Sequence, residues 1–329
     1  MLKKFAPIEE NPLELVDIEV PEPGSGEILI RINVCGACHT DLHTVEGELP
    51  EVHLPIIPGH QVVGQVEKLG ESTSRFREGD RVGVAWLYST DEECKYCQEG
   101  KENLCENAKF TGFHVNWGYS EYINIPERFA YAIPEKFTDE EAAPLLCAGI
   151  IGYRALRQSE IKRGGRLGLI GFGASAHVAI QVAVHWGCEV YVFSRSEEHR
   201  ALAKKLGAVW VGSSEEMPPV KLDSIVNFTP AGRTVLDGMR MLDKGGTQAL
   251  AGIYMSPIPE MDYGKYLYHE RTLRSVANAT RQDGKELLKI ASEIPIRPTT
   301  QVFSLEEANR ALQMLKASRI DGAAVFRIR

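Results

Sequence analysis

The stretch GLIGFGASAH, residues 168–177, decides the fold of this chain. A run of apolar residues leads into the spacing Gly171-x-Gly173-x-x-Ala176, and a helical pattern begins near Ala174. In a strand–turn–helix unit, the first glycine allows a tight turn, the second lets the backbone approach a pyrophosphate, and a small third residue lets helix and strand pack closely. Free N–H groups at the start of the helix then favour an anion. The stretch therefore predicts a dinucleotide-binding loop.

Strands and helices alternate around this loop. Apolar runs predict strands at 166–171, 188–194, 208–212, 222–229, 245–253 and 271–279, and amphipathic patterns that end in glycine predict helices at 174–187 and 196–207. Such alternation is typical of a doubly wound parallel sheet, so we expect an α/β domain in the second half of the chain.

The first part of the chain has a different sequence pattern, of short apolar runs without regular intervening helices. Val- and Ile-rich runs bounded by Gly and Pro predict strands at 27–36, 60–70, 80–87 and 119–126, in a partly barrel-like β domain. Residues 138–158 then show a helical pattern, with Thr138 or Asp139 as N-cap and acids in the first turn. The tail, 304–328, shows one helix and one strand, which we expect to return to the first domain.

Composition limits the possible classes of function. The chain has 329 residues, enough for two domains, and its net charge of −8 argues against nucleic acid or an anionic membrane surface as a partner. No run of 18 apolar residues predicts a membrane span, and the N-terminus has no secretory signal pattern. The seven cysteines are odd in number and clustered near histidines, which favours metal ligands in a cytoplasmic protein over disulfides.

The end of the second strand indicates which dinucleotide binds. NAD requires a carboxylate there for the ribose 2′-hydroxyl. This chain has Ser194 and Arg195 instead, which suit the 2′-phosphate of NADP(H) because a guanidinium pairs bidentately with phosphate. Glu197 and Glu198 count against this interpretation, and an ordinary solvated surface arginine is the alternative.

Potential metal ligands concentrate in VCGACHTDLH (34–43) and PGHQVV (58–63). A catalytic zinc takes three protein ligands and leaves one position for water or substrate, and Cys₂His is a known set. Cys38, His60 and Cys147 can supply that set. Each residue alone is more often part of a core or a surface. Together with a dinucleotide loop, they predict a redox site that contains zinc.

The chain resembles the zinc-dependent medium-chain alcohol dehydrogenases. The motifs that carry the resemblance occur in order over nearly the whole chain: CGACHTDLH, PGHQVVG, FREGDRVGV, CKYCQEGKENLC, LLCAGI, GFGASAH and AKKLGA. The resemblance implies a GroES-like β-rich catalytic domain, residues 1–149 and 285–329, and a Rossmann dinucleotide-binding domain, residues 150–284. It also implies an active site in the cleft between the two domains and hydride transfer between a nicotinamide and an alcohol, aldehyde or ketone.

The resemblance also implies roles for individual residues. Cys38, His60 and Cys147 bind the catalytic zinc, Thr40 contacts the alcohol oxygen and the coenzyme ribose, and His43 is the outer end of a proton relay. Asp41 orients His60 from behind the zinc ligands. The residues expected to bind the coenzyme are His39, Gly171, Gly173, Ala174, Ser175, Ser194, Arg195 and His199.

The stretch TDEECKYCQEGKENLC, residues 90–105, contains three cysteines where the family's structural zinc lobe has four. Cys94, Cys97 and Cys105 match the last three, and counting back one interval places Asp91 at the first. A carboxylate oxygen can ligate zinc, so we expect Asp91 to complete a second zinc site. An empty lobe is the alternative, as is ligation by Glu92 or Glu93.

Two positions depart from the family pattern. Gln61 stands where the family usually has a glutamate near the zinc, and its neutral amide is expected to leave the metal more electrophilic. Ile151 stands where many relatives have a threonine near the nicotinamide ring, and its apolar side chain can still pack on that ring. Loss of coenzyme binding is therefore not expected from Ile151.

Trp86 and Trp117 are the candidates for an apolar substrate pocket. Trp86 follows the strand whose end lines the zinc cleft in the family, and Trp117 follows the three-cysteine lobe. Trp117 fits a core position equally well, because large aromatic residues are common in both settings. An aromatic wall would favour hydrophobic alcohols or aldehydes.

Three alternatives differ in their requirements. A zinc-free quinone or enoyl reductase of the same superfamily lacks the ligand set, a polyol dehydrogenase usually has a carboxylate in place of Cys147, and a non-catalytic nucleotide-binding protein needs neither Thr40 nor His43. The sequence favours a cytoplasmic enzyme with two zinc ions per chain, NADP(H) and a small-molecule substrate. The resemblance implies a homo-oligomer, a dimer or a tetramer, with no nucleic-acid or membrane partner.

Overall fold

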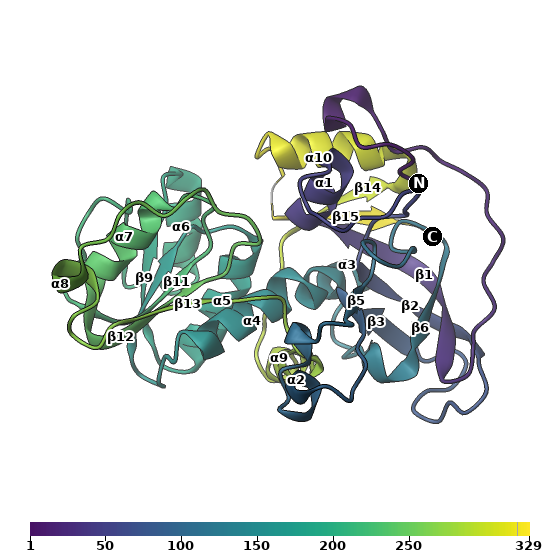
Figure 1. The fold of residues 1–329 in the computed structure, drawn as a ribbon, viewed down its shortest axis with the longest axis horizontal. Coiled ribbons are helices and arrows are strands. Elements are labelled where there is room, and N and C mark those ends of the chain that lie inside the picture. Colours follow the sequence, from purple (N-terminus) through teal and green to yellow (C-terminus); the bar gives the residue numbers. More distant parts are fainter. Residues whose placement is uncertain (321) are drawn as a thin grey trace. The chain divides into compact units, whose positions relative to one another are not determined.

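The computed structural model describes residues 1–320 and 322–329, and they form two compact units (Figure 1). The first unit comprises Met1–Cys147, Thr280–Ser292 and Arg297–Arg329. The second comprises Ala148–Ala279 and Glu293–Ile296. No helix of the described residues is long and apolar enough to cross a membrane. All seven cysteines are present as thiols.

The second unit is built on a six-stranded sheet with the order β10-β9-β8-β11-β12-β13. Its strands are β8 (Arg166–Ile170), β9 (Glu189–Phe193), β10 (Trp210–Gly212), β11 (Leu222–Asn227), β12 (Leu242–Leu250) and β13 (Thr272–Ser275). Its helices are α4 (Ala148–Gln158), α5 (Ala174–His185), α6 (Glu197–Lys205), α7 (Arg233–Met241) and α8 (Tyr263–Tyr266). Every neighbouring pair of strands is parallel. This order is that of a dinucleotide-binding doubly wound sheet, which confirms the predicted fold class.

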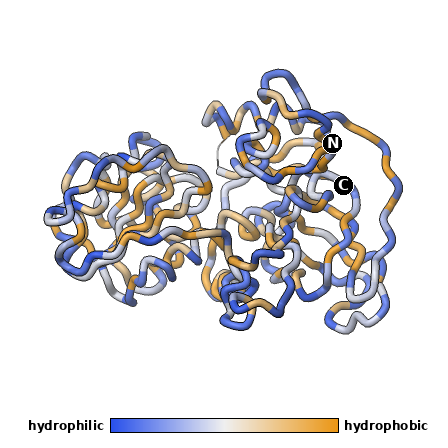
Figure 2. The backbone as a smooth tube through the Cα atoms, in the orientation of Figure 1, coloured by the Kyte–Doolittle hydropathy of each residue, from blue (hydrophilic) through white to orange (hydrophobic). Residues whose placement is uncertain are grey.

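The central strands of this sheet, β8, β9 and β11, are mostly buried, as expected for parallel strands covered by helices. Leu167, Leu169 and Ile170 of β8 are buried, as are Val190 and Val192 of β9. Figure 2 shows many hydrophobic segments in the interior of each unit and many hydrophilic ones in the outer loops and turns.

The first unit contains a seven-stranded sheet with the order β14-β15-β1-β2-β3-β7, and β6 pairs with β1. Its strands are β1 (Glu27–Ala37), β2 (Gln61–Leu69), β3 (Arg81–Val84), β6 (Tyr122–Pro126), β7 (Ala130–Ala132), β14 (Thr300–Ser304) and β15 (Ala323–Arg327). A separate pair consists of β4 (Leu87–Ser89) and β5 (Lys109–Phe110). Strand β1 is the hub, because it pairs antiparallel with β2, β6 and β15.

Short helices connect and flank these strands. The α-helices are α1 (His39–Glu46), α2 (Lys95–Gln98), α3 (Asp139–Ala142), α9 (Arg281–Glu293) and α10 (Ala308–Lys316). The 3₁₀-helices are η1 (Ile8–Glu10), η2 (Glu102–Leu104), η3 (Glu127–Phe129), η4 (Ala143–Leu146) and η5 (Leu305–Glu307). Thr138 is the N-cap of α3, and its hydroxyl accepts a hydrogen bond from the backbone N–H of Glu141.

Three predicted elements differ from the structure. The helical pattern at 138–158 is interrupted: α3 tightens into η4 at Pro144, and Cys147, with φ −130° and ψ −76°, leaves the helical conformation before α4 begins. Proline has no N–H to donate, so an α-helix tolerates it only in the first turn. The α-helix therefore does not continue through Pro144, and the chain forms a 3₁₀ turn instead. The expected strand at 80–87 divides into β3 and β4 around Trp86, and the C-terminal region contains the additional strand β14.

The division into units also differs from the predicted limits. It falls after Cys147 and after Ala279, whereas the limits expected from the resemblance lie after residues 149 and 284. Helix α9 lies largely in the first unit because Arg281, its first residue, forms ion pairs with Glu92 and Glu102. These ion pairs join residues that are far apart in the sequence, so a search for local sequence patterns does not detect them.

Candidate functional site

Three potential metal donors meet in the first unit. Cys38 is the N-cap of α1 directly after β1, His60 immediately precedes β2, and Cys147 follows η4. Sγ of Cys38 lies 3.4 Å from Nε2 of His60 and 3.9 Å from Sγ of Cys147. Nε2 of His60 lies 3.3 Å from Sγ of Cys147. The donor atoms therefore form a closed triangle.

The triangle has the size of a zinc site. With Zn–S bonds of about 2.3 Å and tetrahedral angles, two ligand sulfurs lie about 3.8 Å apart, and a sulfur and an imidazole nitrogen about 3.6 Å apart. The 3.9 Å between the two sulfurs is also far longer than the roughly 2.05 Å of a disulfide bond. Two thiols and one imidazole are donors that zinc prefers, so the residues present fit that metal.

Asp41 hydrogen-bonds to the side of His60 that faces away from the two cysteines. Nδ1 of His60 donates to Oδ1 of Asp41 over 3.1 Å, which leaves Nε2 facing the cysteines. The same carboxylate accepts the backbone N–H of Gly59 at 3.1 Å and that of Cys38 at 2.9 Å. Asp41 thus fixes the backbone on both sides of the site as well as the tautomer of the histidine.

The charges around the triangle favour a cation. The hydrogen bond with the Cys147 thiol lowers the pKa of Cys38 well below its ordinary value, against the effect of burial. That hydrogen bond, together with burial, raises the pKa of Cys147. Burial by itself lowers the pKa of His60, but Asp41 and Cys38 outweigh it and raise this pKa to about 10. Positive charge is therefore stabilised here, and a divalent metal would bind with release of protons.

Helix α1 carries the other polar residues expected near the metal. The Thr40 side chain lies near the Cys38 thiol and helps to lower its pKa, after the larger effect of the Cys147 thiol. His43 lies one turn further along, and its Nδ1 hydrogen-bonds to the Glu48 carboxylate. The ring of His39 lies 6.3 Å from the ring of His43. The Glu48 contact had no signal in the sequence, because it depends on how the chain turns after α1.

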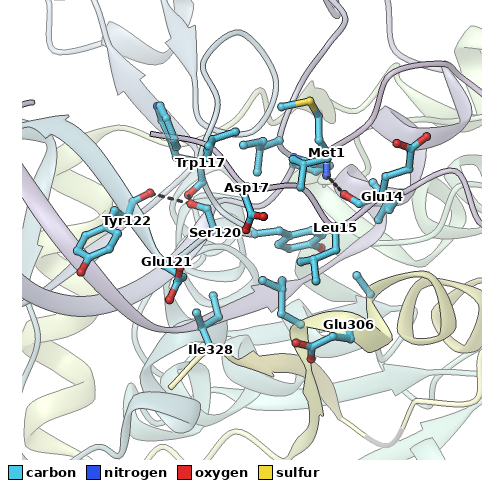
Figure 3. Close-up of a pocket in the computed structure, with 18 of the residues that line it drawn as sticks. Met1, Glu14, Leu15, Asp17, Trp117, Ser120, Glu121, Tyr122, Glu306 and Ile328 are labelled. Carbon is cyan, nitrogen blue, oxygen red and sulfur yellow. Dashed lines mark hydrogen bonds between the residues drawn. The ribbon is translucent and has the colours of Figure 1, made fainter. Parts of the chain in front are cut away.

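The two tryptophans occupy different surroundings. The ring of Trp86 lies 6.2 Å from that of His60, stacks on Phe110 at 4.5 Å and meets the edge of Phe113 at 5.9 Å. Trp86 therefore forms an aromatic wall next to a potential metal ligand. Trp117 instead lines a cavity of about 350 Å³ beside the N-terminal segment, with Met1, Glu14, Leu15 and Ser120 among its other lining residues (Figure 3).

A second cluster of donors lies in the lobe between β4 and β5. Ligand atoms of Asp91, Cys94, Cys97 and Cys105 all lie within 4.8 Å of one another. Three sulfurs and one carboxylate oxygen make up a complete tetrahedral set, so these residues also fit zinc. The backbone N–H of Cys94, first among several hydrogen-bond donors, lowers the pKa of Asp91, so the carboxylate is ionised. Burial raises the pKa of Cys97 to about 12 and also raises that of Cys105.

The neighbouring acids of this lobe have other partners. Glu92 pairs with Arg128 and Arg281, and Glu102 pairs with Arg281, whose guanidinium also lies 4.3 Å from the ring centre of Phe129. The side chain of Glu102 is 9% exposed. The lobe is thereby tied to α9.

The dinucleotide loop has the predicted geometry in the second unit. Gly171 has φ +84°, in the left-handed region that favours glycine, and its N–H donates to the carbonyl of Phe193 at 2.9 Å. Gly173 is the N-cap of α5, and a Cβ added there would meet nothing within 4 Å. Ala176 is fully buried, and a Cβ on Gly152 of α4 would lie 2.6 Å from the Ser175 carbonyl oxygen. The N-terminus of α5, which begins at Ala174, thus packs closely yet leaves space above Gly173 for a phosphate.

Basic groups surround the end of β9. Ser194 is buried, Arg195 and His199 are exposed, and the guanidinium of Arg200 donates to the Ser194 carbonyl at 3.1 Å. The ring of His199 lies 6.5 Å from that of Phe172 in the glycine loop. Arg200 was not predicted, since only the helical geometry of α6 brings it back to the strand end.

A sheet ordered for dinucleotides and two cysteine-rich donor clusters define the class of two-domain, zinc-binding dehydrogenases. Family models agree: residues 24–135 match the alcohol dehydrogenase GroES-like domain, and residues 174–293 match the zinc-binding dehydrogenase domain. The chain belongs to the zinc-dependent medium-chain alcohol dehydrogenases, as predicted, and is an oxidoreductase that acts on alcohols.

Individual relatives resemble the chain over nearly its whole length. It is 44% identical to the probable alcohol dehydrogenase AdhA of Mycobacterium tuberculosis, over 99% of this chain and 96% of that protein. Among solved structures, the cinnamyl alcohol dehydrogenase SbCAD4 of Sorghum bicolor has a TM-score of 0.87 and 27% identity, covering 94% and 92% of the two chains. CAD of Helicobacter pylori, complexed with NADP(H), has a TM-score of 0.84 and 26% identity, covering 93% and 91%.

Proposed function

We propose that this enzyme is a zinc-dependent alcohol dehydrogenase and aldehyde reductase that prefers NADP(H). The observation that carries the proposal is the triangle of Cys38, His60 and Cys147, with donor distances of 3.3 to 3.9 Å, supported from behind by Asp41. A zinc-free reductase has no need of this buried donor set, and neither has a non-catalytic nucleotide-binding protein.

The division of labour follows from the residues present. When bound, the zinc supplies a Lewis acid that lowers the pKa of an alcohol, and the nicotinamide accepts or returns the hydride. Thr40, whose hydroxyl lies next to Cys38, receives the hydroxyl proton of the alcohol. His43, three residues further and on the same side of α1, takes the proton toward solvent, where its side chain is 17% exposed.

The preference for NADP(H) rests on the end of β9. No carboxylate occupies the position of Ser194 or Arg195, where a ribose 2′-hydroxyl would need one. Arg195 and Arg200 place two positive charges near this strand end, and Ser196 caps α6 there by accepting the His199 N–H. A 2′-phosphate would be recognised by such a set. The Helicobacter pylori relative, complexed with NADP(H), agrees with this proposal.

The substrate is a hydrophobic, preferably aromatic, alcohol or aldehyde. Trp86, stacked on Phe110 and bordered by Phe113, offers flat apolar surface beside His60. The name of the sorghum relative, a cinnamyl alcohol dehydrogenase, supports an aromatic substrate class. By resemblance we further expect a cytoplasmic homo-oligomer.

A coenzyme and substrate panel tests the proposal. Oxidation of NADPH and NADH is followed at saturating aldehyde, with benzaldehyde and cinnamaldehyde against acetaldehyde, and the reverse reaction with the matching alcohols. We expect turnover of aromatic substrates with NADPH, lost after chelation and restored by zinc. Turnover of quinones or enoyl compounds that survives full removal of metal would overturn it, as would complete inactivity across the panel.

A further inference from the structure

The turn that ends α1 places an unpredicted carboxylate beside His43. Gly47 adopts the left-handed conformation with φ +71°, and the backbone N–H of Glu48 donates to the His43 carbonyl at 3.0 Å. This is the glycine-ended helix terminus in which the chain folds back over the last turn. The reversal of the chain at Gly47 brings the side chain of Glu48 next to His43, in the last turn of α1.

The carboxylate of Glu48 meets one particular nitrogen of His43. Oε2 of Glu48 hydrogen-bonds to Nδ1 of the imidazole. The His43 side chain is 17% exposed and the Glu48 side chain 51% exposed, so the pair leads from the interior to solvent. A carboxylate accepts only, which means that Nδ1 carries the proton in this contact.

We propose that Glu48 is a positioning residue for proton transfer through His43. By accepting the Nδ1–H, it fixes the tautomer in which Nε2 is the unprotonated nitrogen and can receive a proton. Its negative charge also stabilises the imidazolium that forms when Nε2 is protonated, as a carboxylate does behind a general-base histidine. The inference rests on the relay role of His43 in the proposed function, and adds to it a residue that does not touch substrate.

A double-mutant cycle tests this role. Wild type, E48A, E48Q, H43A and the double variant E48A/H43A are compared in single-turnover stopped flow, with NADPH absorbance reporting hydride transfer and a pH indicator reporting proton release. We expect E48A to slow both signals roughly ten-fold, less than the roughly 10²- to 10⁴-fold that general acid–base catalysis supplies, because His43 itself remains. The alcohol KM should change less than about two-fold, because no substrate contact is lost. E48Q, which keeps an acceptor without the charge, should lie between E48A and wild type.

The decisive comparison is made in the H43A background. If Glu48 acts through His43, E48A adds no further loss once His43 is gone. An equal loss in both backgrounds would assign Glu48 a purely structural role and overturn the inference. E51A is the matched control, because Glu51 is a 76% exposed acid of the same segment that pairs only loosely with His114, at 3.9 Å.

The cycle also separates the two proposals. A slow H43A variant with a full-rate E48A variant would overturn the role of Glu48 alone. A full-rate H43A variant would overturn the relay in the proposed function, and the inference with it.

Discussion

Nδ1 of His60 lies 3.1 Å from Oδ1 of Asp41, and each side chain is 2% exposed. This buried pair orients the histidine toward Cys38 and Cys147. Replacing Asp41 with Asn preserves its size but removes the charge and one acceptor. We expect D41N to weaken zinc binding at this site by about 10- to 100-fold, the usual effect of losing such a partner.

Chelator competition measures that affinity, with the metal content of the second cluster as an internal reference. D80N is the control, because Asp80 accepts a backbone N–H from Arg77 in an exposed turn. Equal zinc affinity in D41N and wild type would show that Asp41 does not support the metal.

Asp91 is expected to complete the second zinc site. D91A removes one of four ligands, so affinity at the lobe should fall by more than the roughly 100-fold expected for an outer-shell partner. Metal analysis should then give two zinc ions per chain for wild type, one for D91A and two for D91C. D91A should also unfold at lower temperature, because a structural metal contributes to folding. E93A is the control for loss of an exposed neighbouring charge, and one zinc ion in the wild type would contradict the prediction.

Coenzyme preference should depend on the end of β9. R195A and R200A each remove one charge from the expected 2′-phosphate site, so kcat/KM for NADPH should fall about ten-fold or more while that for NADH changes little. S194D introduces the carboxylate that a ribose 2′-hydroxyl needs and should reverse the preference. K205A, at the exposed far end of α6, is the control. Parallel losses with both coenzymes would indicate a general loss of structure.

The substitution Q61E tests the effect of a negative charge near the Cys38–His60–Cys147 site. The side chain of Gln61 is 2% exposed, its Nε2 has no hydrogen-bond partner among the described residues, and its Oε1 would lie 2.9 Å from a Cβ on Gly36. A carboxylate at this position would be buried without a hydrogen-bond partner of its own, and bound zinc would offset its charge. Q61E should therefore destabilise the metal-free protein by on the order of several kcal/mol.

The same variant should retain zinc longer during dialysis and change turnover, because negative charge near the metal lowers its electrophilicity. Unfolding with and without zinc measures the first effect. Q65E, further along β2 and hydrogen-bonded to Arg31, makes the same charge change away from the site. Identical stability, zinc retention and turnover in Q61E and wild type would remove any role for this position.

Local pattern predicted the second unit well. The runs 166–171 and 188–194 correspond to β8 and β9, and the glycine loop between β8 and α5 has the expected left-handed turn at Gly171. Buried parallel strands and amphipathic helices differ in period, and this difference can be read within a window of residues. The break at Cys147 was missed because the sequence around it has the composition of a helix, and Pro144, which has no N–H to donate, was not interpreted as a break.

Prediction was less complete at the candidate site. Sequence patterns did not identify Glu48, Arg200 or the aromatic partners of Trp86 as residues of the site. Each reaches its partner through a helix end, a helix turn or a fold of the lobe, and none has a characteristic spacing. Trp117 was a candidate for the substrate pocket and fitted a core position equally well, since large aromatic residues serve packing and binding alike. In the structure it packs against the core of the first unit and lines the N-terminal cavity.

The sequence by itself determined which chemistry is available: two thiols and an imidazole for zinc, a glycine loop for a dinucleotide, and a strand end without a carboxylate. These are properties of residue types and short spacings. Tertiary structure decided that Cys38 and Cys147, 109 residues apart, lie 3.9 Å from one another, and that Glu48 faces His43. The donor strength of an atom belongs to its residue, whereas the distance between two donors is set by the path of the backbone through the whole unit.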